Sequence, residues 1–328
     1  MKKQNNIPAI ALNDRLGISE LIKEQDLSAS SIKSYNIGIS HFWDWVQCVL
    51  KKDATDLTVY DYIAYKKYLG SQNYSNNTKN SYLVAVLAMY KILEKHGVDN
   101  ICSGVRLFDT NKENLKEGVN IEDWQKVLSL INDKKFNGKK HYVIMYLLFV
   151  SGVRQMSLRN LKWGDFGYDA KVGSMVMEVK LKGRGNRREK VLLNEEAVKL
   201  IQEYQFMYVK HYAMDFCGEL GEINKDWYVF GNKDRILKDS SIRKITTEWL
   251  KKAGVYRIGE VTPHSLRHGI AELLIDRGLE VKAVQQFLCH KNISSTMIYA
   301  GRKEKLRVDK QLLGEINTIS FMDLKRCN

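Results

Sequence analysis

The sequence predicts a mainly helical protein with a small β-hairpin, organised as a helical N-terminal domain and a larger α+β domain. In residues 18–97, apolar side chains recur at helical spacing almost throughout. Residues 103–120 are polar and charged without such periodicity, which is typical of a linker between domains. Residues 175–193 alternate in polarity around a glycine-rich turn, as the two strands of a hairpin do. A chain of 328 residues is long enough for two domains of this kind.

In the N-terminal domain, placed at residues 15–102 after a flexible lead-in of residues 1–14, we expect a compact bundle of helices. Serines at residues 28–31 can cap one helix start, a second helix is expected at residues 58–69, and Asn77 can cap a third. The positions expected to face the core are Ile32, Tyr35, Ile39, Phe42, Trp43, Val46, Val59, Tyr62, Ile63, Leu69, Tyr82, Val86, Met89, Tyr90 and Leu93.

In the C-terminal domain, placed at residues 121–302, the pattern predicts further helices around the hairpin. Pro263 restricts its own backbone and marks a helix start, and Gly278 marks the end of that helix. Residues 226–231 are predicted to form a short strand or a buried turn. The other expected helices lie at residues 121–131, 141–150, 195–210, 240–253 and 280–288.

The chain is strongly basic, with 52 Lys and Arg residues against 38 Asp and Glu residues and a net charge of +14. This favours a polyanionic partner, nucleic acid first, and an inert basic surface is the plain alternative. The five cysteines are scattered without a C-x-x-C pair, which argues for a reducing compartment and against a zinc site or a disulfide framework. Because no stretch reaches the roughly 18 apolar residues of a membrane span and no signal peptide is recognisable, we expect a cytoplasmic protein without a membrane partner.

The stretch from residue 262 to residue 300 holds the most informative side chains. His264 and Arg267 lie three apart, on one face of the first turn of a predicted helix. His290 follows the next short helix, and Tyr299 lies nine residues further. Each of them alone is more often structural, because tyrosines usually pack in cores and helix arginines usually cover surface. Their order and spacing together indicate a common site.

The combination resembles the C-terminal signature of the tyrosine recombinases, the phage integrase family. The family pattern is close to T-P-H-x-L-R-H followed by L-G-H-x-x-I-x-T-T-x-x-Y. This chain reads TPHSLRH at residues 262–268 and LCHKNISSTMIY at residues 288–299, with Cys289 where the family usually has glycine.

A second match lies earlier in the chain. GVRQMSLRNLKWGDF at residues 152–166 resembles the family's first motif, with Arg154 at its first catalytic arginine and Ser157 in place of the usual glutamate. The helix start at residues 28–35 resembles, more weakly, that of the family's core-binding domain. The resemblance implies a SAM-like helical core-binding domain ahead of an α+β catalytic domain, and the two domains could close around a DNA duplex as a clamp.

The family carries a mobile catalytic lysine on a hairpin like the one predicted here. An ungapped alignment on the return strand places that lysine at Arg184, and Lys182 lies two residues earlier on the same strand face. We favour Lys182, because an ammonium group can give up a proton whereas a guanidinium effectively cannot. Lys180 is the outside option, and the plain alternative is a basic turn that only contacts phosphate.

These residues suit a displacement at a phosphodiester. Arg154 and Arg267 can neutralise and orient the phosphate oxygens, on which negative charge builds up in the transition state. The Tyr299 hydroxyl is a suitable nucleophile, because a phosphotyrosine retains the bond energy and the step can be reversed. The remaining roles fall to Lys182 as general acid, His264 as general base or proton relay, and His290 as hydrogen-bond donor to the phosphate.

No cofactor is expected. The sequence shows no acidic cluster with metal-ligand spacing, which disfavours a two-metal nuclease or transposase. It also lacks the G-x-x-x-x-G-K-[ST] loop that would imply ATP.

Weaker candidates for DNA contact lie at helix starts and in the hairpin turn. Helix N-termini present unpaired N–H groups and a favourable dipole to phosphate, although ordinary capping explains the same residues. The candidates are Ser30, Ser31, Lys33, Thr78, Lys79, Arg184 and Arg187.

The resemblance implies the rest of the expected activity. Members of the family cut one strand at a time, form a 3′-phosphotyrosyl bond and exchange strands through a Holliday junction within a DNA-bound tetramer. We therefore expect double-stranded DNA with an inverted-repeat site as partner, a homotetramer on DNA, and a monomer or dimer off DNA, in the nucleoid of a prokaryotic cell. The apolar tail at residues 303–328 is expected to dock on a neighbouring protomer or on its own domain.

Two other functions stay open from the sequence. A catalytically silent DNA-binding regulator could use the same fold, and a type IB topoisomerase shares the chemistry. The five matched site positions favour an active recombinase over the regulator. Chain length, the helical N-terminal bundle and the tail favour it over the topoisomerase. An integrase of a mobile element and a Xer-like dimer resolvase both remain compatible with the residues.

Overall fold

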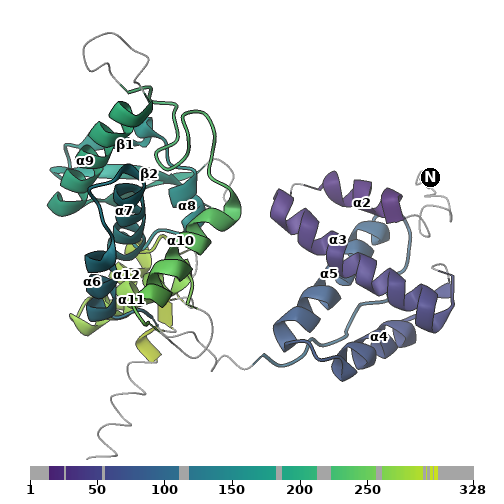
Figure 1. The fold of residues 1–328 in the computed structure, drawn as a ribbon. Coiled ribbons are helices and arrows are strands. Elements are labelled where there is room, and N and C mark those ends of the chain that lie inside the picture. Colours follow the sequence, from purple (N-terminus) through teal and green to yellow (C-terminus); the bar gives the residue numbers. More distant parts are fainter. Residues whose placement is uncertain are drawn as a thin grey trace, which may run out of the picture. The chain divides into compact units, whose positions relative to one another are not determined.

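The computed structural model describes residues 15–25, 27–53, 56–110, 118–181, 187–212, 223–255, 261–290, 293, 296–297 and 299–301. The chain divides into two compact units, Met1–Asn114 (unit 1) and Leu115–Asn328 (unit 2), and each is considered by itself (Figure 1). As predicted, the described chain is mainly helical and carries one small antiparallel sheet. The expected lead-in at residues 1–14 and the tail at residues 303–328 lie outside the described residues.

Unit 1 is a bundle of helices around one aromatic core. Its described elements are α2 (Arg15–Lys23), α3 (Ala29–Trp45), the π-helical turn η1 (Val46–Leu50), α4 (Val59–Ser71) and α5 (Asn76–Glu94). α3 and α5 pack together, and the side chains of Phe42 and Leu83 are fully buried. The predicted bundle is therefore present.

Short polar side chains set the starts of these helices. Ser28 caps α3, since its Oγ accepts the backbone N–H of Ser31 at 3.2 Å. α5 is capped by Ser75, whose Oγ accepts the N–H of Thr78 at 3.2 Å. Asn77, predicted as that cap, is instead the second residue of the helix. The prediction was two residues late because the turn offers several residues that can cap.

The buried face of α4 differs from the predicted one. Ile63 is 47% exposed and Val59 is 37% exposed, although both were expected in the core. The predicted Tyr62 and Leu69 are buried, and so is Tyr65, which was not predicted; their spacing of three and four residues marks a single helix face. Ile63 lies about 100° around the helix from Tyr62, so only one of the two adjacent residues can face the core.

The segment predicted as a linker is attached to unit 1 at its beginning. The backbone N–H of Phe108 donates to Asn80 Oδ1 at 2.8 Å, and Asn80 Nδ2 donates to the Phe108 carbonyl at 2.9 Å. The ammonium groups of Lys66 and Lys79 lie over the Phe108 ring, 5.2 and 5.6 Å from its centroid.

The other end of that segment belongs to unit 2. The N–H of Val119 donates to the carbonyl of Ser265 at 2.9 Å, and the Val119 side chain is fully buried. The predicted linker at residues 103–120 is therefore too long, because its ends pack on the two units. Between them, residues 111–117 lie outside the described part of the chain.

Unit 2 holds the sheet and most of the helices. Its described elements are α6 (Ile121–Leu130), α7 (Phe136–Val150), α8 (Gln155–Arg159), the 3-10 turn η3 (Trp163–Asp165), β1 (Phe166–Asp169), β2 (Ser174–Lys180), β3 (Arg188–Leu192), α9 (Glu195–Tyr212), α10 (Asp239–Lys252), α11 (Pro263–Asp276) and α12 (Val281–Phe287). Figure 1 shows α11 beside α6, and α11 also packs on α12, while α9 lies by the sheet. α7 is the central helix, and its residues from Val143 to Phe149 are all buried.

The sheet has the order β1-β2-β3, with both pairs antiparallel. The predicted hairpin forms β2 and β3, in which Lys180 pairs with Arg188. β1 was not predicted, because its four residues are too short to show an alternating pattern. The predicted strand or turn at residues 226–231 is a buried turn, in which Val229 and Phe230 are fully buried and only Tyr228 makes an isolated bridge.

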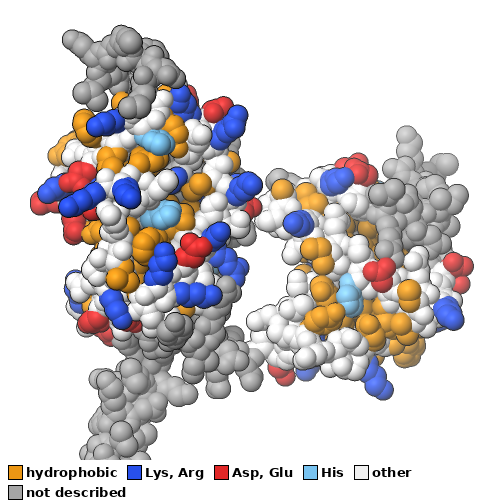
Figure 2. Space-filling view, viewed as in Figure 1, with side chains coloured by type: hydrophobic (Ala, Val, Ile, Leu, Met, Phe, Trp, Pro, Cys, Tyr) orange, Lys and Arg blue, Asp and Glu red, His pale blue; other side chains and the backbone are white. Residues whose placement is uncertain are grey.

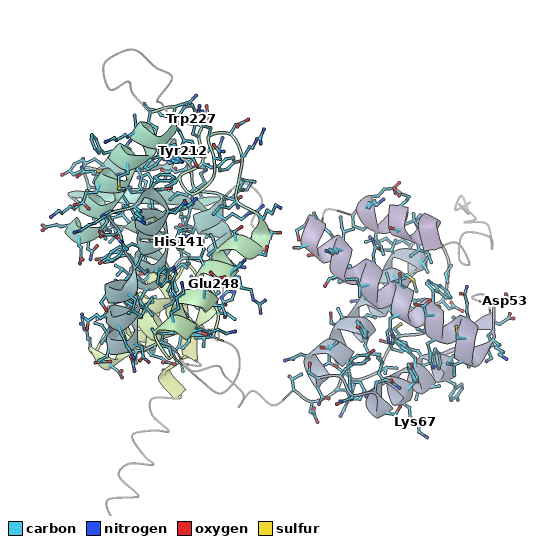
Figure 3. The ribbon with its side chains drawn as sticks, viewed as in Figure 1. Asp53, Lys67, His141, Tyr212, Trp227 and Glu248 are labelled. Carbon is cyan, nitrogen blue, oxygen red and sulfur yellow. The ribbon has the colours of Figure 1, made fainter. Side chains whose placement is uncertain are left out.

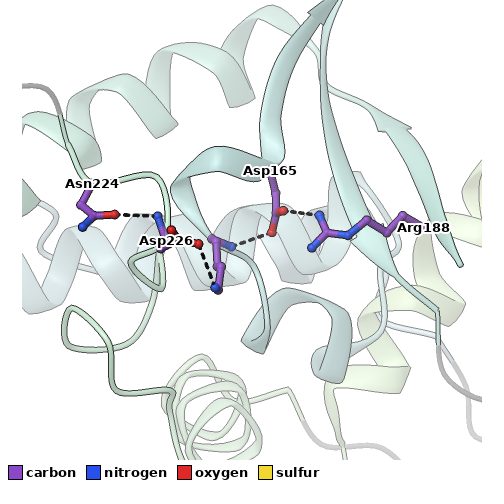
Figure 4. Close-up of polar contacts among 5 residues, drawn as sticks. Asp165, Arg188, Asn224 and Asp226 are labelled. Atoms are coloured by element: carbon purple, nitrogen blue, oxygen red, sulfur yellow. Dashed lines mark hydrogen bonds and ion pairs between the residues drawn. The ribbon is translucent and has the colours of Figure 1, made fainter. Parts of the chain in front are cut away.

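Polar contacts tie the connecting segments of unit 2 to the sheet (Figure 4). Asp165 accepts from the Arg188 guanidinium on β3 and from the backbone N–H of Lys162 at 2.8 Å. The Lys162 ammonium pairs with Asp226 at 3.2 Å. Asp165 is largely buried, so its pairing with Arg188 satisfies a charge that would otherwise be costly.

Helix α10 is fixed on α7 by a second polar contact. The indole Nε1 of Trp249 donates to Nδ1 of His141 at 3.2 Å. Figure 3 labels His141 together with Glu248, whose charge also acts on that histidine.

None of the described helices is both long and apolar enough to cross a membrane.

We predict that Gly269→Ala destabilises the protein by about 1–3 kcal/mol through overpacking. A Cβ at Gly269 would lie 1.8 Å from the Val119 carbonyl oxygen, and that backbone is itself held by Ser265. Gly167→Ala is the matched control, since a Cβ there meets nothing within 4 Å. Urea unfolding followed by tryptophan fluorescence measures both variants. Equal unfolding midpoints for the two variants would contradict the packing described.

Candidate active site

The first two turns of α11 carry three polar side chains on one face. Pro263 occupies the first helical position, as the sequence predicts, and the N–H of Thr262 donates to Ser265 Oγ at 3.2 Å. His264, Arg267 and His268 then follow at helical spacings of three and four residues. His264 is exposed and His268 half-buried, whereas Arg267 is only 4% exposed.

Arg267 joins three parts of unit 2. Its Nη1 donates to the carbonyl of Gly152, just after α7, and its Nη2 donates to the carbonyl of Leu288, just after α12, at 2.6 Å. These bonds use two of the five N–H groups of the guanidinium. Burial, and next the charge of Arg154, lower the pKa of Arg267 to about 10, so it still carries its charge at neutral pH.

Arg154 reaches the same place from the turn between α7 and α8. Gly152 makes this turn with φ +58°, and a Cβ on it would lie 2.8 Å from the Leu288 side chain. Arg154 then forms the N-cap position of α8. Its side chain lines a narrow pocket with that of Arg267. Two guanidinium groups side by side repel each other, so the pocket is suited to an anion.

Ser157, which stands where the family usually has glutamate, has a clear structural role. Its buried hydroxyl donates to the backbone carbonyl of Lys180 at 2.9 Å. It thereby fastens α8, which carries Arg154, to the end of β2. Beyond that end lie Lys182 and Arg184, both outside the described residues. Lys180, the third candidate for the lysine role, is exposed at the end of β2.

The chain turns sharply after α12 and places His290. Cys289 has φ +50°, and its N–H bonds the carbonyl of Gln286 at 2.9 Å. The N–H of His290 bonds the carbonyl of Gln285 at 3.0 Å. These two bonds and the left-handed residue form a Schellman motif, which explains why glycine is usual at this position in the family. The motif forms here with cysteine as well.

His290 is a neutral group held beside the arginines. Its Nδ1 lies 2.8 Å from Thr296 Oγ1, and Thr296 is fully buried. Burial lowers the pKa of His290 to about 3, helped by the charges of Arg267 and Arg154. At neutral pH this imidazole can exchange hydrogen bonds but adds no charge, which is compatible with the predicted role of donor to a phosphate.

Tyr299 is docked within its own unit. It is 6% exposed and packs against Ala271, Val284 and Leu288. Its hydroxyl is not sealed in apolar surroundings, because it lies 2.6 Å from Nδ1 of His268. It also interacts electrostatically with Arg267. In this structure, therefore, the tyrosine reaches the site of its own chain.

The structure thus brings four predicted residues together. Arg154 and Arg267 line one pocket, Tyr299 interacts electrostatically with Arg267, and His290 does so with both arginines. His264 lies one helical turn from His268, with ring centroids 6.5 Å apart. His268 was missed by the sequence analysis. A signal was available, because His268 is four residues from His264 within the TPHSLRH motif and so shares its helix face.

The candidates for DNA contact in unit 1 divide into three groups. Lys79, a candidate for phosphate contact, is only 8% exposed, and its ammonium donates to the Gly70 carbonyl at 3.0 Å. The hydroxyls of Ser30, Ser31 and Thr78 lie within 3.0 Å of the capping serines, which supports the capping interpretation. Lys33 is exposed and lines an open groove along α3.

In unit 2, Arg187 is exposed and pairs with Glu189 at 2.9 Å. The face of unit 2 seen in Figure 2 carries basic side chains among acidic and apolar ones. Within the described part of the chain, no group of three or more His, Cys, Asp or Glu residues is arranged to hold a metal ion.

Comparison with known proteins identifies the chain's relatives. The model of the phage integrase family matches residues 120–305, more than half of the chain. The tyrosine recombinase XerC of Leptospira interrogans is 24% identical over 295 residues, covering 88% of this chain and 89% of that protein. The tyrosine recombinase XerA of Thermococcus kodakarensis is 25% identical over 296 residues, covering 88% and 93%.

Solved structures show the same fold. The XerH site-specific recombinase bound to its palindromic difH substrate superposes with a TM-score of 0.68 at 20% identity, covering 93% of this chain and 84% of that one. A lambda integrase dimer bound to a core site superposes with a TM-score of 0.63 at 16% identity, covering 88% and 94%. With the family model and the fold in agreement, this chain belongs to the phage integrase family and is a tyrosine recombinase.

Proposed function

We propose that this chain cleaves and rejoins DNA strands at a specific site by using Tyr299 as nucleophile, with the scissile phosphate held between Arg154 and Arg267. The observation that carries the proposal is the position of the Tyr299 hydroxyl, which bonds His268 and interacts with Arg267 beside the arginine pocket. A silent DNA-binding regulator would need no such arrangement.

The arginine pocket supplies the electrostatic part of the reaction. A phosphodiester bound beside Arg154 and Arg267 relieves the repulsion between them, and it is stabilised further as charge builds on its oxygens in the transition state. Because Arg267 is held by two backbone carbonyls, little reorganisation is needed. Removing one preorganised donor of this kind typically costs about 10²–10³ in rate.

The leaving oxygen needs a proton, and we assign that role to Lys182. The hairpin that carries it is anchored by the contact between Ser157 and the Lys180 carbonyl. Arg184 cannot serve as an acid, since a guanidinium keeps its proton. Lys180 remains the second choice.

The partners follow from the relatives. XerH was solved bound to difH, and lambda integrase as a tetramer bound to a Holliday junction. We infer that this chain likewise binds an inverted-repeat DNA site, assembles as a homotetramer there and exchanges strands through such a junction. The tail at residues 303–328 is the segment we assign to contact with a neighbouring protomer, and its own domain is the alternative.

We expect Tyr299→Phe to abolish the covalent protein–DNA adduct while DNA binding is retained. The substrate is a nicked duplex whose site is selected from random-sequence DNA by binding to this variant, and the assay runs in EDTA because no metal is invoked. Adducts are counted by denaturing gel. If the variant still forms the adduct, the nucleophile is another residue.

Lys182→Ala should slow adduct formation by about 10²–10⁴, the usual worth of a general acid. Arg184→Ala, the neighbouring control, should slow it far less. A 5′-phosphorothiolate leaving group, which needs no proton, should restore the rate of Lys182→Ala. If the phosphorothiolate does not restore the rate, the general acid is another residue.

The neutral state of His290 predicts a pH dependence of stability. Its pKa is about 3 in the folded chain and about 6.5 when unfolded, so between these values the unfolded chain binds more protons. The contribution of neutral His290 to the free energy of unfolding is therefore complete above pH 6.5, and it is lost as the pH falls toward 3. In His290→Gln the free energy of unfolding should decline less between pH 7 and pH 4 than in the parent. Parallel curves for the two proteins would show that His290 titrates normally, and His96→Gln controls for loss of a histidine from unit 1.

A further inference from the structure

We propose that His268 is the general base that takes the proton from Tyr299 during cleavage and returns it during rejoining. This inference rests on the proposed function, in which Tyr299 is the nucleophile. It replaces the sequence-based assignment of that base to His264.

The contact between the two side chains is direct. Nδ1 of His268 lies 2.6 Å from the Tyr299 hydroxyl oxygen, and the two rings are 5.3 Å apart at 52°. A general base has to be within hydrogen-bond reach of the proton it removes, and this distance satisfies that condition. Three buried residues, Ala271, Val284 and Leu288, surround the tyrosine, so the imidazole rather than bulk water meets its hydroxyl.

His264 is placed less well for this task. It is exposed one helical turn before His268, and their ring centroids are 6.5 Å apart. At that position it can exchange protons with solvent and pass them to His268. The structure therefore favours a relay role for His264 and the direct contact for His268.

The charge beside the tyrosine oxygen supports its loss of a proton. On its own helix it is flanked by His264, Arg267 and Glu272, and the neighbouring segments add Arg154 and His290. The charge of Arg267 interacts with the Tyr299 oxygen, which stabilises that oxygen as it loses its proton. His290 is electrostatically coupled to His268 and is neutral, so it adds no opposing charge.

The O–H bond of Tyr299 breaks, its proton moves to His268 Nδ1, and its electron pair forms the new O–P bond. The P–O5′ bond breaks, and the departing oxygen takes a proton from the general acid, assigned to Lys182. Rejoining reverses both transfers. The step requires the tautomer of His268 that carries its proton on Nε2, which leaves Nδ1 as acceptor.

His268→Asn distinguishes two roles of His268, the hydrogen bond to the Tyr299 hydroxyl and the uptake of its proton. The asparagine amide reaches the place of Nδ1 and can bond the hydroxyl, but it cannot take up a proton at ordinary pH. We expect adduct formation on the selected nicked duplex to slow by about 10²–10⁴ at pH 7. The rate should then rise about tenfold per pH unit, because hydroxide must remove the proton, whereas the parent levels off.

His264→Asn, one turn away on the same face, is the matched variant. It removes the relay and so lowers the rate, but its rate should still level off with pH as that of the parent does. The proposal is overturned if His268→Asn reacts at the parental rate, if it is slow without the rise at high pH, or if that rise occurs in His264→Asn instead. DNA binding and thermal unfolding show that each variant is folded.

A second measurement does not depend on cleavage. In protein labelled with ¹⁵N-histidine, the Nδ1 resonance of His268 should shift when Tyr299→Phe removes the hydroxyl. An unchanged resonance would overturn the proposal even if the variants prove unstable. Absence of any adduct with the parent protein would instead count against the proposed function, and the ¹⁵N measurement would still decide the contact.

Discussion

The site depends on the hydrogen bonds of Arg267 to the carbonyls of Gly152 and Leu288. A buried guanidinium is costly unless its N–H groups are paired, and these carbonyls come from the ends of α7 and α12. The side chain therefore fixes the mutual positions of three segments that are distant in sequence. One of them leads directly to Arg154, and another leads to His290. Arg267 therefore contributes both to the geometry of the site and to the stability of the fold.

The second constraint is the proximity of Arg154 and Arg267. Burial, and next the charge of Arg154, lower the pKa of Arg267; burial, and next the charges of both arginines, hold the pKa of His290 far below its usual value. A site with two fixed cations and a neutral imidazole presents two positive charges to an anion, and the imidazole can add a hydrogen bond. A protonated His290 would add a third positive charge and raise the cost of the empty site.

Two departures from the family pattern are absorbed by local structure. Cys289 adopts the left-handed conformation that glycine usually supplies, at a cost of about 1–2 kcal/mol, and the Schellman bonds that place His290 still form. Ser157 cannot replace a carboxylate, yet its hydroxyl ties α8 to β2. The elements themselves were largely predictable, since helix periodicity and the hairpin pattern are local. β1 and the attached ends of the predicted linker were not, because they depend on pairing partners far along the chain.

The sequence by itself determined which chemical groups are available and their local placement. Helical spacing after Pro263 puts His264, Arg267 and His268 on one face whatever surrounds the helix. Only the tertiary structure decided which histidine meets Tyr299, because two residues one turn apart on one face cannot be told apart by spacing. The tertiary structure likewise decided that Lys79, near the start of a helix, is buried, because its ammonium bonds the Gly70 carbonyl and lies over the Phe108 ring. Such choices are made by contacts between distant residues, which no local pattern contains.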